Sequence, residues 1–459
     1  MMAKTIDEKR LIQLLLGIAF AAVILQIIDK SLNSSLFASS NFPPPEIIIF
    51  GLLTVASIAI QFILIYGGKR VAMIGGARSL FASIFHKSII ILEGFLCILL
   101  LLIFFQSLFV MSYSVIILEI SIGTSLIVSS IILAVLASRF LRTLRYIKNR
   151  VVLAYMVATA VLSLNAIMTF IYVEIFLTRR PEVITSDYNT WTSFGSFLPD
   201  SFALLYQLIG IISFATFWIA TLLLTRHYAT KTGTIRYWIL ISIPLVYFAS
   251  QYLISYVEDL NPLRIFRIEN TSIYSYLYNL FLNTARIAGG VLFGFALFAI
   301  SRSITHLQLR NSIIIAGIGL IVLAGVNSTL IIIMTDFPPW GVLSISFSIA
   351  GSYCLMIGLD SAAFYVASDS ALRRFIQRLP TRSLDLLRSL SFTKIQDMIA
   401  NRVEGLSDDI YDEIDRNSLF TSISEPSNVK AYVDEVLKEV HKDKSSAEEQ
   451  NGKPQNGTT

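Results

Sequence analysis

The 459-residue sequence has few of the residues from which metal and catalytic sites are commonly built. It contains two cysteines and four histidines. Cys97 and Cys354 both fall inside long apolar runs, where a free cysteine behaves as a small hydrophobic residue, so they imply no disulfide scaffold. The histidines fall in the segments between apolar runs or in the tail, and no metal-ligand spacing results. We therefore expect no metal ion and no haem or copper held by paired intramembrane histidines.

Motifs of the commoner nucleotide-binding and hydrolytic enzymes are also missing. There is no Walker A loop, no HExxH sequence and no GxSxG sequence. The charged C-terminal tail, about 90 residues long, is too short for a kinase catalytic domain. We expect a protein that is not an enzyme and that needs no cofactor.

Charge is scarce as well, at 15% of residues, whereas 55% are hydrophobic and the mean hydropathy is +0.69. This composition is typical of polytopic membrane proteins, and the expected environment is the lipid bilayer. The net charge of +5 does not indicate nucleic-acid binding, because the tail after position 368 carries thirteen Lys and Arg against sixteen Asp and Glu. The excess positive charge belongs to the apolar part of the chain.

Ten stretches are long and apolar enough to cross a membrane as helices. We expect an all-α polytopic membrane helix bundle with about ten transmembrane helices, at 11–28, 46–66, 88–109, 113–138, 151–176, 202–224, 237–256, 279–300, 312–334 and 341–367. The eighth has an alternative, because 273–281 is rich in tyrosine and is compatible with a segment at the membrane interface. One helix more or fewer there would move the tail to the other side.

Loops rich in Lys and Arg alternate along the chain with loops that contain few of them. If the N-terminus is inside, the inner segments hold seventeen of them and the outer segments five, namely Lys30, Arg179, Arg180, Arg264 and Arg267. The positive-inside rule then predicts that both termini are cytoplasmic and that the protein lies in the cell membrane.

The C-terminal part reads as a soluble helical tail. Its first apolar stripe recurs at spacings of three and four residues between 395 and 414. We divide the chain into a transmembrane domain at 1–367, a cytoplasmic tail of amphipathic helices at 368–442 and a disordered end at 443–459. The second stripe is the expected binding surface for a protein partner or a second copy, unless the two stripes pack on each other, and it consists of Val429, Tyr432, Val433, Val436, Leu437 and Val440.

The turn 336–341, with two prolines followed by Trp340 and Gly341, precedes the last span, and Asp369, Leu372 and Arg373 follow it. Together with the segments 389–400 and 432–440, this pattern resembles a group of archaeal polytopic membrane proteins. The resemblance covers the last quarter of the chain. It implies a serine- and glycine-rich last span and a two-helix tail, and it implies no activity.

The ionisable residues within spans are the candidates for a site, since charge inside a bilayer is costly. Arg286 is expected to face the bundle interior, where Glu119 and Glu174 lie at a matching depth as possible partners. Such a group would bind an anionic or zwitterionic solute or relay protons, unless it is a fixed ion pair that only orders the bundle. Glu93 and Asp360 lie toward the inner side and are candidates for a second polar layer, although Asp360 is also explained as a helix-end residue near Arg373 and Arg374.

Two functions fit these observations. The first is a non-enzymatic sensory or assembly protein whose cytoplasmic tail helices associate with a partner or with a second copy. The second is a secondary transporter with its site near Arg286, Glu119 and Glu174. A polar cavity that reaches the middle of the membrane would favour transport, and a closed bundle would favour sensing or assembly.

Overall fold

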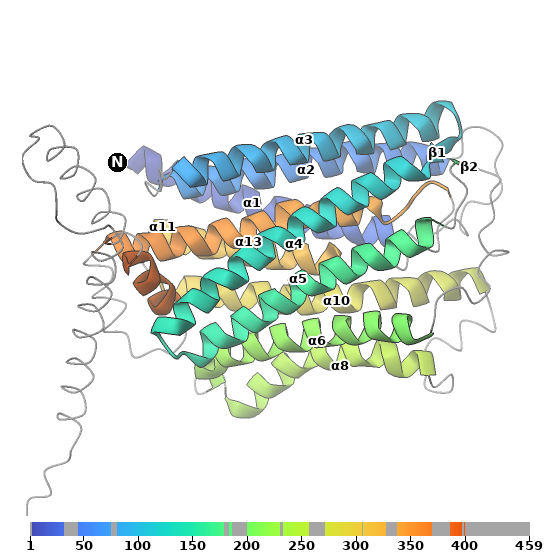
Figure 1. Cartoon of the computed structure of the whole chain (residues 1–459). Coiled ribbons are helices and arrows are strands. Elements are labelled where there is room, and N and C mark those ends of the chain that lie inside the picture. Colours follow the sequence, from blue (N-terminus) through green and yellow to red (C-terminus); the bar gives the residue numbers. More distant parts are fainter. Residues whose placement is uncertain are drawn as a thin grey trace, which may run out of the picture. The chain divides into compact units, whose positions relative to one another are not determined.

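The computed structural model describes residues 2–31, 45–74, 80–178, 183–185, 200–229, 233–256, 271–304, 306–326, 337–369, 386–396 and 399. Long helices dominate this part of the chain and lie side by side (Figure 1). Those of 20 residues or more are α1 (Met2–Ser31), α2 (Pro45–Ile74), α3 (Leu80–Phe109), α4 (Val115–Tyr146), α5 (Arg150–Leu177), α6 (Asp200–Thr225), α8 (Thr234–Tyr256), α10 (Thr271–Arg302), α11 (Leu307–Val326) and α13 (Val342–Ser368).

Nine of the described helices are long and apolar enough to cross a membrane, which confirms the prediction of a helical, multi-pass membrane protein. The seventh predicted span coincides with α8, whose described apolar part, Thr234–Ser250, is shorter. At the eighth span, α10 is one continuous helix through the tyrosine-rich segment. The last helix, α13, ends one residue beyond the predicted boundary at 367.

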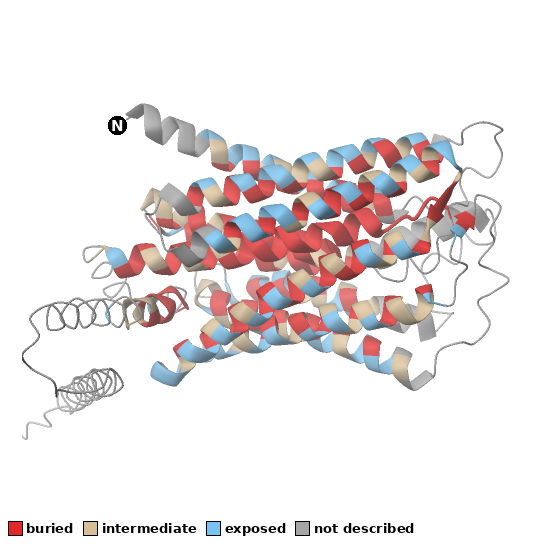
Figure 2. Cartoon of the chain, turned by 45° about the horizontal axis from the view of Figure 1, so that its top comes forward, coloured by how far each residue is buried: buried red, intermediate tan, exposed pale blue. Residues whose placement is uncertain are grey.

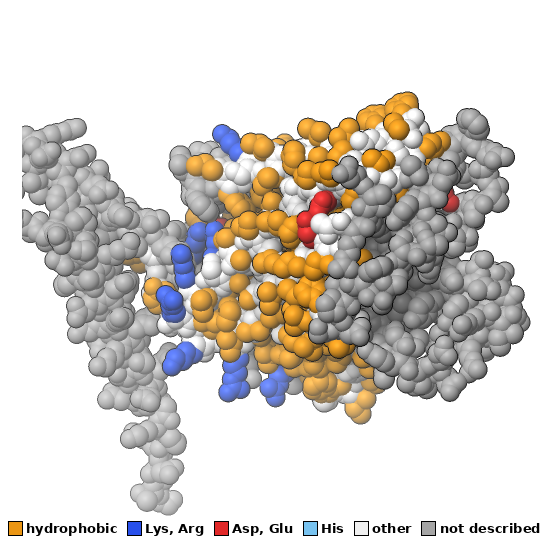
Figure 3. Space-filling model, turned by 45° about the vertical axis from the view of Figure 1, so that its right-hand side comes forward, with side chains coloured by type: hydrophobic (Ala, Val, Ile, Leu, Met, Phe, Trp, Pro, Cys, Tyr) orange, Lys and Arg blue, Asp and Glu red, His pale blue; other side chains and the backbone are white. Residues whose placement is uncertain are grey.

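The outer face of these helices is hydrophobic. Large apolar side chains such as Phe20, Leu52 and Ile91 are more than half exposed, and hydrophobic atoms cover most of the visible side of the bundle (Figure 3). In a water-soluble protein such a surface would drive aggregation, whereas in a bilayer it contacts lipid tails.

Helix α13 forms the centre of the bundle. It packs against α11, α4, α2, α1 and α3. Almost all of its side chains are buried, as are most of those of α11, and the buried residues concentrate in the middle of the bundle (Figure 2). Small residues bring it close to α11. A Cβ atom added at Gly358 would lie 2.5 Å from the backbone nitrogen of Ala316, and one added at Gly319 would lie 2.4 Å from the backbone nitrogen of Leu355. Only glycine allows these two backbones to approach so closely.

A short pair of strands closes one end of the bundle. Strand β1 (Ser112–Ser114) pairs antiparallel with β2 (Val183–Thr185), with Tyr113 opposite Ile184. The Tyr113 ring stacks on Phe337, which begins the turn before α13, with ring centroids 6.2 Å apart. These strands were not predicted from the sequence, because three-residue strands inside loops carry no periodic signal. We call this end of the bundle the hairpin end.

The opposite end gathers the positive charge, and we call it the basic end. Of the Lys and Arg side chains described in α1 to α13 and the turns between them, only Arg286 lies away from it, as the helix bounds show. The others are Arg10, Lys69, Arg70, Lys87, Arg139, Arg142, Arg145, Lys148, Arg150, Arg226, Arg236, Arg302 and Arg310. On the face seen in Figure 3, the Lys and Arg side chains gather toward one end of the bundle. The loops that are rich in Lys and Arg in the sequence thus lie at the same end of the bundle.

The chain divides into two compact units, Met1–Ser391 and Phe392–Thr459. The first unit therefore includes the residues that follow α13, up to Ser391. In this segment Leu386, Leu387 and Leu390 are buried in a hydrophobic core cluster that also holds side chains of α4, α5 and α13. The Asn149 side chain donates a hydrogen bond of 3.3 Å to the Ser389 hydroxyl. The partner-binding stripe from Val429 to Val440 and the predicted disordered end lie outside the described residues.

Candidate functional site

Glu93 of α3 is the most unusual buried group in the bundle. Its side chain has no exposed surface, and neither carboxyl oxygen has a hydrogen-bond partner within the described part of the chain. The carboxyl interacts electrostatically with the thiols of Cys97, one turn further along α3, and Cys354 of α13. A buried polar group without a partner is rare in proteins and calls for a functional explanation.

His86 lies on the same helix as Glu93, two turns closer to the basic end. The sequence analysis placed it in a loop, which is wrong, because α3 begins at Leu80 and the His86 side chain is 5% exposed. Its Nδ1 atom is hydrogen bonded to the Tyr353 hydroxyl at 2.8 Å, while Nε2 has no partner among the described residues. Because positions seven apart share one face of a helix, His86 and Glu93 both point toward the core.

The serines of α13 form a row of hydrogen bonds to the surrounding helices. Ser344 donates to the Asp29 carboxylate of α1, Ser346 accepts from the Gln61 side chain of α2, and Ser348 bonds to Ser125 of α4 at 2.7 Å. From the sequence these serines were expected only as part of a serine- and glycine-rich last span. Each hydrogen bond also fixes the position of a neighbouring helix against α13.

Asp29 was not predicted as a site residue, because it stands at the end of the first apolar run and was counted with the loop. The structure buries it completely. Its carboxylate accepts hydrogen bonds from the backbone nitrogens of Gly341 and Ser344, at 3.1 and 2.8 Å, and from the Ser344 hydroxyl at 2.7 Å. A negative charge at the N-terminus of α13 satisfies the unpaired N–H groups of the first turn and complements the helix dipole.

Asp360 is paired with Arg139 of α4, and this is the one ion pair among the described residues. Both side chains are about a quarter exposed, at 25% for Asp360 and 29% for Arg139. The predicted second polar layer joined Asp360 to Glu93, and no contact between these two is found in the described part of the chain. Arg373 and Arg374, the other suggested neighbours of Asp360, lie outside the described residues.

Breaking this ion pair is expected to destabilise the protein moderately. Replacing Arg139 with leucine should lower the free energy of unfolding by about 1–2 kcal/mol, because the pair is partly shielded from water. The exchanged pair, Arg139→Asp with Asp360→Arg, should recover most of the loss. Thermal unfolding of the detergent-purified variants measures both effects, and an exchanged pair no more stable than Arg139→Leu would contradict the prediction.

Glu119 and Glu174 project from the adjacent helices α4 and α5, and their carboxyl groups interact with each other. Both side chains are partly exposed on the flank of the bundle. The sequence led us to expect one of them beside Arg286.

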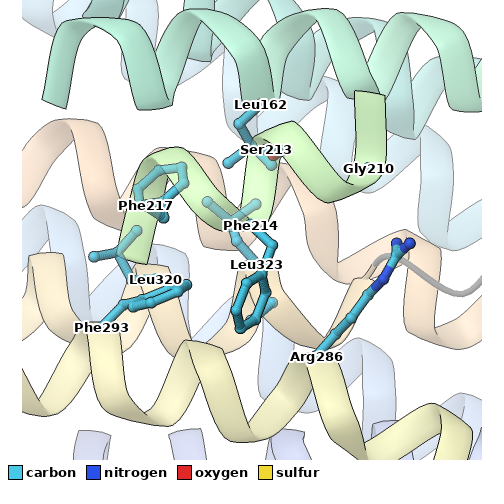
Figure 4. A pocket seen from close by; sticks show the side chains of 10 residues that line it. Leu162, Gly210, Ser213, Phe214, Phe217, Arg286, Phe293, Leu320 and Leu323 are labelled. Carbon is cyan, nitrogen blue, oxygen red and sulfur yellow. The ribbon is translucent and has the colours of Figure 1, made fainter. Parts of the chain in front are cut away.

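Arg286 lies elsewhere, beside a small cavity between α5, α6, α10 and α11 (Figure 4). The guanidinium points toward Gly210, where an added Cβ atom would lie 3.0 Å from Nη2, and its Cζ atom is 5.9 Å from the centre of the Phe248 ring. The cavity has a volume of about 60 Å³, and most of its lining is apolar. Neither Glu119 nor Glu174 lines this cavity or forms an ion pair with Arg286 in the described part of the chain.

A cavity of this size holds a few water molecules and is far below the roughly 300 Å³ at which small-molecule sites begin. Among the described residues, no group of three His, Cys, Asp or Glu is arranged to hold a metal ion. Comparisons with protein-family models, curated proteins and solved structures gave no match. The archaeal resemblance therefore stays a prediction, and the geometry of the buried groups alone carries the functional argument.

Proposed function

We propose that this chain is a non-enzymatic sensory membrane protein in which α13 passes a change inside the bundle to the C-terminal tail. The observation that supports this is the double role of α13. It holds the buried polar contacts with α1, α2, α3 and α4, and the chain that follows it is packed into the core through Leu386, Leu387 and Leu390. A shift of α13 would therefore move the start of the tail directly.

The small size of the cavity at Arg286 favours sensing over transport. Its volume is far below that of a small-molecule site, and neither Glu119 nor Glu174 lines it in the described part of the chain. The secondary transporter remains the alternative function, favoured by the presence of an arginine on an internal cavity. Solute uptake by the protein in proteoliposomes, abolished by Arg286→Leu, would support that alternative.

We further propose that both termini are cytoplasmic and that the protein resides in the cell membrane. The basic end of the bundle is the end at which α1 begins and α13 finishes. Short segments rich in Lys and Arg stay on the cytoplasmic side during insertion. With α8 counted as a tenth span, the even number places the tail on that side, where its apolar stripes would meet a protein partner or a second copy.

The experiment for this function compares truncated chains. A version ending at Arg378 lacks both the packed segment around Ser389 and the apolar stripe from Val429 to Val440. A matched control ending at Lys442 lacks only the polar end. We expect the first to lose a co-purifying partner or to change from dimer to monomer by native mass, and the second to behave as the full chain.

A pair of substitutions tests the stripe within the full chain. Val433→Asp with Val436→Asp should abolish the association, because two charges on an apolar contact face cost several kcal/mol. The control Lys438→Glu changes charge on the same predicted helix outside the stripe and should have no effect. Retained association in the aspartate variant, with normal insertion into the membrane, would show that the stripe is not the contact surface.

A further inference from the structure

The carboxyl group of Glu93 lacks the partners that a buried charge needs. An ionised carboxylate that leaves water without a compensating cation or hydrogen bond costs several kcal/mol, and buried acids avoid this cost by holding a proton. Glu93 is completely buried, and both oxygens are without hydrogen bonds in the described part of the chain. It also lies within Ile84–Phe109, the part of α3 that is long and apolar enough to span a membrane.

The groups around Glu93 do not supply a counter-charge. Helix α3 packs against α2, α4, α13 and β1, and none of the titratable groups described on these elements forms an ion pair with Glu93. Arg139 is paired with Asp360, and Glu119 lies against Glu174. Among the others, Lys69 interacts with His86, and the thiols of Cys97 and Cys354 interact with Glu93. The remaining titratable groups described on these elements are Glu46, Tyr66, Arg70, Lys87, Tyr113, Arg142, Arg145, Tyr146, Tyr353 and Tyr365.

The same surroundings disfavour a metal ion as the ligand. Sodium and other hard cations need several oxygen ligands around one point. The described groups that interact electrostatically with Glu93 are two thiols, and no described group of three His, Cys, Asp or Glu is arranged to hold a metal ion. A proton is the ligand that one carboxyl group can bind without further ligands.

Glu93 is also placed to act on α13. Its electrostatic partner Cys354 follows Tyr353, the residue that bonds to His86 of α3. The Cys354 thiol donates a weak hydrogen bond to the Leu64 carbonyl of α2 at 3.7 Å. If Glu93 lost its proton, the new charge would lie at the contact of α3 with α13, and relieving its cost would require water to enter or the helices to separate.

We propose that Glu93 is a proton-binding site, and that proton release from it loosens the packing of α13 against α3. The link from α13 to the tail rests on the proposed sensory function, whereas proton binding itself does not. In this arrangement the stimulus is a change of pH, and the response is a change in the packing of α13 against α3.

The sign of the pH dependence follows from linkage. The folded protein holds a proton on Glu93, whereas the exposed carboxyl of the unfolded chain, with a pKa of about 4.3, has given it up by neutral pH. Folded stability therefore falls as pH rises above that value. The thermal midpoint of the full-length protein in detergent should therefore fall by several degrees between about pH 5 and about pH 8. Glu93→Gln, which mimics the protonated form, should remove most of this fall, and Glu93→Asp should retain it.

Infrared spectroscopy tests the proton directly. The difference spectrum of wild type minus Glu93→Gln at neutral pH should contain the carbonyl band of a protonated carboxyl, and that band should shift on exchange into D₂O. Replacing sodium by choline at constant pH should leave the thermal midpoint unchanged. Absence of the band, an unchanged pH dependence in Glu93→Gln, or a midpoint that follows sodium would each overturn the proposal.

The two proposals fail separately. If the carboxyl band is present but truncation at Arg378 changes neither native mass nor partners, the sensory function is wrong and the proton site stands. If truncation abolishes association but the band is missing, the proposed role of the tail is correct, and proton binding to Glu93 is not the stimulus.

Discussion

Gly358→Ala is expected to lower the free energy of unfolding by about 3 kcal/mol, the upper range for overpacking a core. The added methyl group would lie 2.5 Å from the backbone nitrogen of Ala316, 2.7 Å from the carbonyl oxygen of Ser312 and 2.9 Å from the Ala316 Cα atom. All three atoms belong to the backbone of α11 and cannot rotate away. The two helices must move apart along a contact that both need for burial, and Gly319→Ala should act in the same way.

Two other glycines provide matched controls. An added Cβ atom at Gly17 of α1 or at Gly94 of α3 would meet no atom within 4 Å. Because glycine disfavours helix interiors, Gly17→Ala and Gly94→Ala should be neutral or stabilising by up to about 1 kcal/mol. Unfolding in mixed detergent micelles measures all four variants, and equal stabilities for Gly358→Ala and Gly94→Ala would show that the contact of α11 with α13 is looser than described.

Asp29→Ala is expected to have an effect of similar size, about 3 kcal/mol, since a hydrogen-bonded charge is removed and buried donors are left unsatisfied. The backbone nitrogens of Gly341 and Ser344 would lose their acceptor, and the first turn of α13 would lose the charge that complements its dipole.

The control for Asp29 is Ser344→Ala, which removes one of the donors found among the described residues and keeps the backbone nitrogens of Gly341 and Ser344 as partners of the carboxylate. It should cost about 1 kcal/mol, the usual net value of a single hydrogen bond. Thermal unfolding and protease resistance of the purified variants measure both. A larger effect for Ser344→Ala than for Asp29→Ala would mean that the serine hydroxyl, and not the helix cap, is the important group.

How far the sequence predicts the fold can be judged from individual elements. The spans follow from apolar length alone, because a membrane helix must satisfy its backbone internally, and α5 and α13 lie within a few residues of their predicted bounds.

The direction in which each side chain points was not readable. Helices that are apolar on all sides give no periodic pattern, so the sequence does not distinguish the lipid-facing side from the core-facing side. Arg286 was expected beside the two glutamates and instead faces α6 and a cavity. Asp360 meets Arg139 across 221 positions of sequence, a pairing that requires knowing which helices are neighbours. Whether the Glu93 carboxyl has a hydrogen-bond partner likewise depends on how all the helices around it are placed.

The central position of α13 has a consequence for how the protein is made. Ribosomal synthesis produces this helix after the others that surround it, yet Asp29, Gln61 and Ser125 belong to the first third of the chain and form buried hydrogen bonds with it. These contacts form only once α13 has been synthesised. The earlier helices therefore reach their final packing after the last helix has been inserted among them.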